Sequence, residues 1–252
     1  MIKYRKFIYS EFSKNMKDFF NIIFENDDVV VINKYSGIFV LSNEESKSKT
    51  ITDILQEHLK QEIFPVSSLD YEASGIIIFA KNRNTYEFVS EQFKKEKVNK
   101  IYYILVNGIM DEAEGDIDKN LIVNEQTTSV DDKGIKSVTK YKVIEQFKNF
   151  AFVEVYPLTT RKNQIRAHFW SIGNTLAIDK IYGSEEPILL SNLKRRYKGI
   201  AKEKPLLKRL PMHLYQIELF LPGIKEKNMF TSPLPDDIQL TLKQLRKYNK
   251  RG

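Results

Sequence analysis

The sequence contains no cysteine, which excludes disulfide bonds and zinc sites built from thiolates. Its three histidines, His58, His168 and His213, show no metal-ligand spacing, so no metal ion is expected. No apolar run of about 18 residues exists, and no membrane-spanning helix is therefore predicted. The basic N-terminus leads into no apolar segment, so no signal peptide is expected either. These absences favour a cytoplasmic protein that is not attached to a membrane.

Positive charge is what the sequence has in excess. Lys and Arg number 40 and Asp and Glu 33, which gives a formal net charge of +7. Such a charge favours a polyanionic partner, although a moderate excess of lysine is also common in soluble proteins. The 252 residues are enough for one large hydrophobic core or two modest ones.

One segment concentrates this positive charge, and its only acidic residue is Glu203. Its basic residues are Lys194, Arg195, Arg196, Lys198, Lys202, Lys204, Lys208 and Arg209. The segment is either a solvated loop without a partner or an insertion that contacts phosphates. We favour phosphate contact, because a nucleic-acid backbone relieves the repulsion between like charges. Arg195, Arg196 and Lys198 are its candidate binding residues.

The hydrophobic pattern predicts interspersed strands and helices. Strands are expected at about 28–33, 38–41, 76–80, 101–107, 137–145, 150–158 and 213–221, and helices at about 52–61, 83–95, 162–172 and 238–249. Residues 1–26 have helical spacing, with Met16, Phe19, Phe20 and Ile23 on one apolar stripe. This succession of elements predicts an α+β fold with a mixed sheet.

Asp70 lies just ahead of a fully apolar run, Ile76 to Ala80, which is typical of a strand covered on both faces. Ser74-Gly75 is a turn signal that bends the backbone into this strand. A carboxylate held on such a short loop is a candidate nucleophile or acid/base group. The alternative is an Asx turn, in which Asp70 bonds only local N–H groups. From these residues alone, the Asx turn is the stronger interpretation.

A resemblance to a known family changes this balance. Leu69-Asp70 and Ser74-Gly75 resemble the catalytic motif of the RluA-type pseudouridine synthases, His-Arg-Leu-Asp-x-x-Thr-Ser-Gly. Ser67 and Ser68 stand in place of the motif's His and Arg, and Ala73 in place of its Thr.

Further blocks follow in the family's order, from about residue 27 to about residue 238. The block from Lys100 to Gly108 is similar to the family's Lys-x-Tyr-x-x-x-Val strand. The block from Pro157 to His168 is similar to Thr-Gly-Arg-x-His-Gln-Leu-Arg-x-His, with Thr160 in place of the glycine. Smaller matches are Val31–Gly37, Gly173, Asp179, Tyr182-Gly183 and Phe230–Pro235.

The resemblance implies a specific fold and activity. The fold would be a bisected, largely antiparallel mixed sheet with flanking helices and a central RNA cleft. Residues 1–26 would be an N-terminal extension with little of the basic, helix-rich character of an S4 RNA-binding module. Residues 27–238 would form the catalytic domain and residues 239–252 a basic, amphipathic C-terminal helix. The activity would be isomerisation of uridine to pseudouridine in structured RNA, ribosomal or transfer RNA, without a cofactor. We expect a monomer that does not act on DNA.

The resemblance also assigns the site residues. Asp70 would be the catalytic aspartate, as nucleophile or base, and Arg166 would pair with it. Tyr102 would stack on the target uracil, and its hydroxyl would help to remove the C5 proton. Arg161 and Gln164 would contact RNA, and Gln164 or Tyr102 would supply a further hydrogen bond to the ion pair.

Each of these side chains also has an ordinary structural interpretation. Arg166 lies off the apolar stripe of its predicted helix, where arginines are commonly solvated, and Thr160 is the predicted N-cap of that helix. Tyr102 shares a strand face with Ile104 and Val106, as a core aromatic would. We adopt the functional interpretation for Arg166 and Tyr102. His168 and His213 are expected to be structural.

Two replacements leave alternatives open. In relatives the arginine missing at Ser68 fills the gap left by the extruded base, and Thr160 lacks the backbone freedom of glycine. The protein is therefore either an active synthase with altered base flipping or a non-catalytic RNA-binding protein on the same fold. An Asp-dependent hydrolase would need a second placed carboxylate, and Glu72 is too close in sequence to Asp70.

Overall fold

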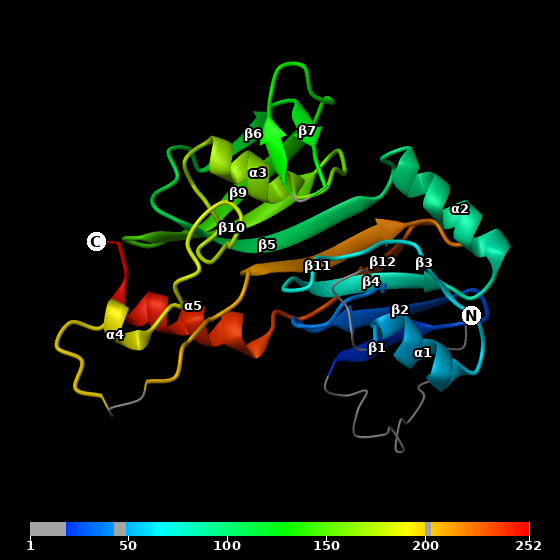
Figure 1. Ribbon diagram of the computed structural model, residues 1–252, viewed down its shortest axis with the longest axis horizontal. Coiled ribbons are helices and arrows are strands. Elements are labelled where there is room, and N and C mark those ends of the chain that lie inside the picture. The colour runs from blue at the N-terminus through cyan, green and yellow to red at the C-terminus, as the bar shows by residue number, and fades with distance from the viewer. Residues whose placement is uncertain (1–18, 43–48, 126, 200–202, 252) are drawn as a thin grey trace.

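The computed structural model describes residues 19–42, 49–125, 127–199 and 203–251, and these form a large sheet flanked by helices (Figure 1). The sheet has ten strands, in the order β1-β2-β4-β11-β5-β10-β9-β6, with β12 paired to β11 and β3 paired to β4. All pairings are antiparallel except that of β4 with β11. This mixed, mostly antiparallel sheet confirms the predicted α+β fold.

The elements have the following bounds. The first half of the sheet contains β1 (Phe20–Glu25), β2 (Val29–Lys34), α1 (Ile51–Leu59), β3 (Phe64–Pro65), β4 (Ser74–Ala80) and α2 (Arg83–Lys94). The second half contains β5 (Asn99–Asn107), β6 (Glu114–Asp118), β9 (Val138–Gln146) and β10 (Phe150–Pro157), and is followed by α3 (Gln164–Ser171). Strands β7 (Leu121–Val123) and β8 (Thr128–Val130) pair with each other in a separate two-stranded sheet. The chain ends with α4 (Leu190–Leu193), β11 (Met212–Leu219), β12 (Asn228–Thr231) and α5 (Asp236–Tyr248).

In the first half, β4 is buried along its whole length, because side chains pack on both of its faces. On one face Ile77 clusters with Leu55 of α1, and on the other Ile76 clusters with Val89 of α2. α1 starts at a capping box formed by Thr50, which fixes where the helix begins. The continuous apolar run of β4 is therefore the pattern of a central strand.

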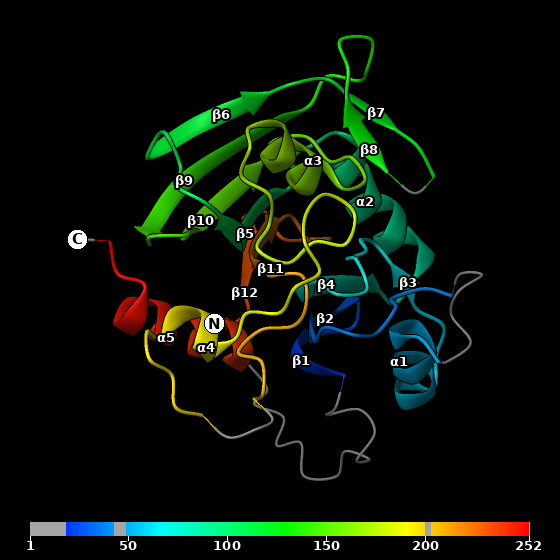
Figure 2. The same ribbon diagram turned by 60° about the vertical axis from the view of Figure 1, so that its left-hand side comes forward.

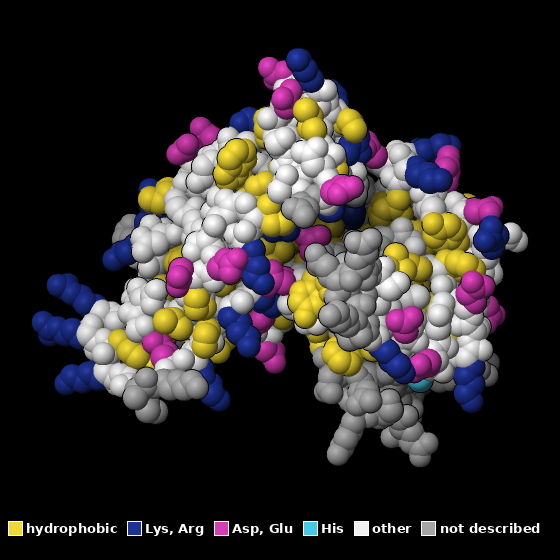
Figure 3. All heavy atoms as spheres, viewed as in Figure 1, with side chains coloured by type: hydrophobic (Ala, Val, Ile, Leu, Met, Phe, Trp, Pro, Cys, Tyr) yellow, Lys and Arg dark blue, Asp and Glu magenta, His cyan; other side chains and the backbone are white. Residues whose placement is uncertain are grey.

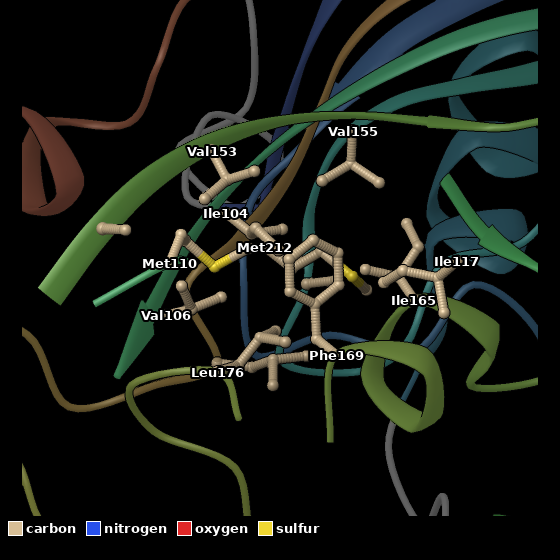
Figure 4. Close-up of a cluster of buried hydrophobic side chains, with 13 residues drawn as sticks. Ile104, Val106, Met110, Ile117, Val153, Val155, Ile165, Phe169, Leu176 and Met212 are labelled. Carbon is tan, nitrogen blue, oxygen red and sulfur yellow. The ribbon is translucent and has the colours of Figure 1, made fainter. Parts of the chain in front are cut away.

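In the second half, β5 separates two cores, because its side chains alternate between the faces of the sheet. Ile104 and Val106 cluster with Phe169 of α3. Figure 4 shows the ring of Phe169 pointing from α3 toward side chains of β5 and β10. Leu105 faces the other way and clusters with Leu242 of α5. Helices α3 and α5 accordingly lie on opposite sides of β5 and β10 (Figure 2).

The two halves meet at the pairing of β4 with β11. Only His213 with Ser74 and Leu214 with Gly75 are in register in this parallel pair. A Cβ on Gly75 would lie 2.4 Å from the carbonyl oxygen of Leu214, so only glycine permits this approach. Asp70 stands four residues before Ser74, at the point where the halves join.

The predicted N-terminal helix is wrong where the structure describes it. Phe20 and Ile23 lie in strand β1, which pairs with β2 in the main sheet. Phe20 is buried, whereas Ile23 is exposed at the irregularity where the register of β1 shifts between Ile22 and Phe24. Met16 lies outside the described residues. The proposed boundary at residue 26 therefore separates two paired strands.

Two further expectations are also wrong. Residues 38–41 form no strand, although Val40 is buried, because the segment packs as a loop against the first core. Thr160 is not the N-cap of α3, which starts after Asn163. Within the described ranges, no helix has the length and apolarity needed to cross a membrane.

Candidate active site

A pocket of about 400 Å³ opens between the two halves of the sheet. Its walls come from the segment 68–70 before β4, from Lys100 and Tyr102 on β5, and from the segment 157–166 that leads into α3. Met212 of β11 closes the wall between them. The three sequence blocks singled out above thus meet at one cavity.

The segment that carries Asp70 is fixed from the protein interior by Leu69 and Lys34. Leu69 packs against three hydrophobic clusters drawn from both halves of the sheet. Lys34 is fully buried, and burial lowers its pKa to about 7. Its ammonium donates hydrogen bonds to the carbonyl oxygens of Tyr35, Tyr71 and Ala73, at 2.9, 3.0 and 2.7 Å. The backbone around Asp70 is therefore tied down on its inner side.

Ser74 ties the same segment to β11. Its hydroxyl lies 2.9 Å from Nδ1 of His213, and Nε2 of His213 lies 3.1 Å from the carbonyl oxygen of Ser232. Burial lowers the pKa of His213 to about 4, so the ring is neutral near pH 7. His168 is likewise buried, between the hydroxyl of Thr139 at 2.9 Å and a backbone carbonyl at 3.0 Å. Both histidines have the structural role expected from the sequence.

Arg166 contacts two carboxylates at once. Its Nη1 donates to Oδ2 of Asp70 at 3.2 Å, and its Nε and Nη2 donate to Oδ2 and Oδ1 of Asp179 at 2.8 and 2.6 Å. The Oδ1 atom of Asn163 accepts a further bond from Nη1 at 3.1 Å. Burial alone would lower the pKa of Arg166, but the bonds and charges of Asp179 and Asp70 outweigh it and raise the pKa. Arg166 is therefore a permanent cation.

Asp179 is fully buried beneath this arginine, whereas the side chain of Asp70 is 37% exposed to the pocket. The Oδ1 atom of Asp179 also accepts the backbone N–H groups of Ile181 and Tyr182, at 2.9 and 3.1 Å. The guanidinium carbon of Arg166 lies 5.4 Å from the centre of the Tyr182 ring. Asp179 thus holds Arg166, and Asp70 keeps oxygen surface free for a ligand.

Tyr102 is partly buried and packs against hydrophobic clusters of both halves. Burial, reinforced by the charge of Asp70, raises the pKa of its hydroxyl. The phenol therefore stays protonated beside Asp70.

Gln164 is buried, and its amide is saturated by the protein itself. Oε1 accepts from the hydroxyl of Thr159 at 2.8 Å and from the N–H of Arg161 at 3.1 Å. Nε2 donates to the carbonyl oxygen of Val138 at 3.1 Å and to the hydroxyl of Thr139 at 2.9 Å. With all four hydrogen-bond positions used, Gln164 shapes the loop before α3 and has none left for RNA. It also does not contact the pair of Asp70 and Arg166.

The basic segment lies apart from this pocket. Arg195, Arg196 and Lys198 are exposed next to α4, where Figure 3 shows Lys and Arg side chains gathered at one end of the molecule. Arg209 differs from them, because it is buried and bonds Asp237 through two nitrogens at 2.7 and 2.8 Å. Its place in the phosphate-contacting segment is therefore a wrong expectation.

The sequence interpretation missed two residues that contact Arg166. In the sequence, Asp179 stands out only as one of the smaller family matches, and no pattern indicates a role for Asn163. Neither lies near Asp70 in sequence, and Asn163 is displayed by a left-handed backbone with φ of 54°. The only sequence feature that could have identified Asp179 as a site residue is its match to the family, in the expected order after the block from Pro157 to His168.

Comparisons with known proteins identify the family of the chain. The sequence model of a family described as RNA pseudouridylate synthase matches residues 28–171, more than half of the chain. The chain belongs to the RluA-type family of RNA pseudouridine synthases. It is an isomerase that converts uridine to pseudouridine in RNA.

Curated relatives match over most of the chain. A ribosomal large subunit pseudouridine synthase D of Buchnera aphidicola subsp. Acyrthosiphon pisum is 32% identical over 231 residues, 88% of this chain and 72% of that protein. An uncharacterized RNA pseudouridine synthase of Chlorobaculum parvum is 28% identical over 249 residues, 89% of this chain and 74% of that protein.

Solved structures show the same fold. The human RNA pseudouridylate synthase domain containing 4 superposes with a TM-score of 0.68 at 23% identity, covering 89% of this chain and 92% of that one. The human RNA pseudouridylate synthase domain containing 1 gives a TM-score of 0.64 at 19% identity, covering 92% and 97%.

Proposed function

We propose that Asp70 is the catalytic carboxylate of the isomerisation, that Arg166 orients it, and that Tyr102 stacks on the target uracil. One observation carries this proposal. Asp70 meets Arg166 at the wall of an open pocket while Asp179 holds the arginine from the other side. A carboxylate aimed in this way has lost its freedom to turn before the substrate arrives, which is how a catalytic group is preorganised.

The reaction breaks the N-glycosidic bond, turns the uracil and joins its C5 to the ribose. A carboxylate supports this either by attacking C1′, which forms an ester that uracil C5 later displaces, or by removing the C2′ proton, which yields a glycal that takes the proton back at C2′ when C5 adds to C1′. In either route C5 then loses its proton and N1 takes one up, so the product is an isomer of the substrate. In both routes the electron pair of the glycosidic bond leaves with uracil. Asp70 has the exposed oxygen surface that either route needs.

Tyr102 serves this reaction by stacking and not by removing a proton. Its pKa is raised by burial and by Asp70, so a phenolate base would be costly to form. A protonated tyrosine ring still offers a flat surface for the uracil, and stacking of a base on an aromatic side chain contributes about 1–3 kcal/mol. This energy offsets part of the cost of unstacking the base, about a few kcal/mol.

The substrate we propose is ribosomal RNA of the large subunit, which the names of several relatives specify for those proteins. Arg195, Arg196 and Lys198 would then contact phosphates outside the pocket, since they are exposed and lie in a segment with little acidic charge. Gln164 becomes a positioning residue in this proposal, and Arg161 remains a candidate RNA contact because it lines the pocket.

The alternatives are less well supported. A protein that only binds RNA would not need an aimed carboxylate, and here Asp70 is in place and its pocket is open. A hydrolase with two carboxylates would need a second free one near Asp70. The carboxylate that does approach it, Asp179, is fully buried and occupied by Arg166.

The test is Asp70→Asn, which keeps the shape of the side chain and removes its charge. Pseudouridines are mapped in RNA from three strains of cells, which carry the wild-type gene, the variant gene or no copy of the gene. We expect the variant to lose isomerisation, with RNA binding nearly intact. A fully active Asp70→Asn protein would contradict the assigned role, and modification of transfer RNA alone would contradict the substrate.

A further inference from the structure

Lys100 is a buried cation without a carboxylate partner within the described part of the chain. It is 8% exposed, and it lies on β5 two residues before Tyr102, so both side chains face the same pocket. Its Nζ contacts one neutral group, the hydroxyl of Thr160. A buried ammonium costs several kcal/mol when no opposite charge offsets its desolvation. A cation left in this condition in a binding pocket is suited to an anion supplied by the ligand.

A second unsatisfied donor lies in the same wall. Arg161 uses its Nη1 on Glu96 at 2.8 Å, but its Nε is buried without a hydrogen-bond partner. Burial lowers the pKa of Lys100 to about 8, Glu96 partly opposes this, and the charge of Arg161 adds to it. Lys100 and Arg161 are therefore two neighbouring cations at this wall. Among the described residues, Glu96 pairs with Arg161 and Asp70 with Arg166, and neither carboxylate forms an ion pair with Lys100.

We propose that Lys100, Thr160 and Arg161 form an anion subsite that binds a phosphate of the target nucleotide. The inference rests on the proposed function, because it places the uracil on Tyr102 and the ribose beside Asp70. The only anionic group of a nucleotide within RNA is its phosphodiester, so a phosphate is the group that these donors match. The subsite holds the backbone while the base is out of its stack.

The hydroxyl of Thr160 orients the ammonium of Lys100 in the subsite. Thr160 stands where the family motif has glycine, so this chain has a side-chain oxygen at a position where the motif has none. The hydroxyl accepts one proton of the Lys100 ammonium, which leaves two protons for phosphate oxygens.

Binding should weaken as the pH rises through about 8, because Lys100 loses its charge there. Phosphate stabilises the charged form, so bound RNA raises the pKa of Lys100 and binding takes up a proton. The other charged groups that line the same pocket are Asp70, Arg161, Lys162 and Arg166, and the charge of Glu96, the partner of Arg161, also acts on Lys100. If Lys100 were instead a base that takes the C5 proton, the turnover number would increase through pH 8. The two roles therefore predict opposite dependences on pH.

The experiment measures the dissociation constants of the 252-residue chain for uridine, uridine 5′-monophosphate and an oligouridylate of ten nucleotides. The wild type is compared with two variants of Lys100 and one control variant. Lys100→Met keeps the length of the side chain without its charge, and Lys100→Arg keeps a charge that does not titrate near pH 8. Lys97→Met, at an exposed lysine just before β5, is the matched control. Thermal melts establish that each variant folds.

For the wild type we expect the monophosphate to bind at least tenfold more tightly than uridine. Lys100→Met should weaken binding of the oligonucleotide about 10- to 100-fold, the range for a charged hydrogen bond. It should also remove the preference for the monophosphate and flatten the salt dependence by about 0.7. Lys100→Arg should keep the affinity and lose its dependence on pH near 8.

An unchanged salt slope and an unchanged monophosphate preference in Lys100→Met would overturn the subsite. An increase in the turnover number through pH 8 that Lys100→Arg abolishes would assign Lys100 to proton transfer instead. The proposed function fails by a different result, an active Asp70→Asn protein, which would leave the monophosphate preference in place.

Discussion

Arg166 and Asp179 form a buried ion pair with two parallel hydrogen bonds of 2.8 and 2.6 Å. The pair is bidentate and buried, so the guanidinium plane can neither turn nor tilt. The nitrogen that remains, Nη1, is aimed at Asp70. The direction of the proposed catalytic carboxylate is thus set by a second carboxylate that never meets the substrate.

Asp179→Ala should therefore reduce both stability and activity. Removing one partner of a buried ion pair costs about 3–5 kcal/mol when the other charge is left unpaired. At Arg166 the single 3.2 Å bond to the partly exposed Asp70 offsets only part of this loss. Urea unfolding measures this loss, and single-turnover kinetics measures the loss of rate. Asp179→Asn keeps the acceptor for two backbone N–H groups and should be milder.

The matched control is Asp116→Ala, which removes an ion pair with Lys140 whose side chains are 51% and 49% exposed. An exposed pair contributes about 1 kcal/mol or less. Equal losses of stability at Asp116 and Asp179 would contradict the role of Asp179.

Gly75→Ala should destabilise the junction between the halves. The new Cβ would lie 2.4 Å from the carbonyl oxygen of Leu214, and φ at this residue is +122°. Overpacking costs about 1–3 kcal/mol and backbone strain about 1–3 kcal/mol, so we expect the free energy of unfolding measured in urea to fall by roughly 2–6 kcal/mol. Gly223→Ala has a φ of +71° and nothing within 4 Å of its Cβ, so it isolates the strain. The prediction fails if both variants lose the same stability.

His213 should make the fold sensitive to mild acid. Its pKa is about 4 in the folded protein and about 6.5 in the unfolded chain, so the unfolded chain binds the proton first. Stability is then lost as the pH falls from about 6.5 to 4, by roughly 3 kcal/mol in total. Between pH 6.5 and 4, the free energy of unfolding measured in urea should decrease less for His213→Asn than for the wild type.

Ser68 is exposed at the rim of the pocket, where the family motif has arginine. Its side chain is too short to fill the space left by an extruded base, so we expect uridines in loops or single strands to react much faster than paired ones. Ser68→Arg should extend the activity to uridines within stems. Turnover on a matched hairpin pair, with the target uridine in the loop or in the stem, measures this. Equal rates for the wild type on both would refute the prediction.

The sequence predicted best the parts of the fold that repeat a simple pattern. The apolar run of β4 and the alternation of Tyr102, Ile104 and Val106 each predict which side chains are buried. The burial of β4 and the hydrophobic clusters around β5 confirm these predictions. Strand β6 was missed because its sequence, Glu114–Asp118, is mostly acidic and lies at the edge of the sheet. Strand β1 was mistaken for a helix because short strands and helices share apolar spacings over a few residues.

The site was harder to predict than the fold, since its contacts join distant segments. The convergence of Asp70, Tyr102 and Arg166 came from resemblance, and no local pattern indicates that Asp179 lies under Arg166. The sequence does not show that the amide of Gln164 is occupied, because the two hydrogen bonds donated by its Nε2 go to Val138 and Thr139, about 25 residues earlier in the chain. Hydrogen bonds of this kind are visible only in the folded chain.

The pocket is also a product of late folding. Asp70 and Arg166 are 96 residues apart along the chain, and β11, which joins the halves, comes after both. Such long-range contacts form slowly and only when most of the chain is present. A nascent chain still on the ribosome, or a fragment that lacks β11, holds the proposed catalytic side chains without an assembled site. Activity should therefore appear in one step with the completed fold, and partial products of synthesis or proteolysis should leave RNA unmodified.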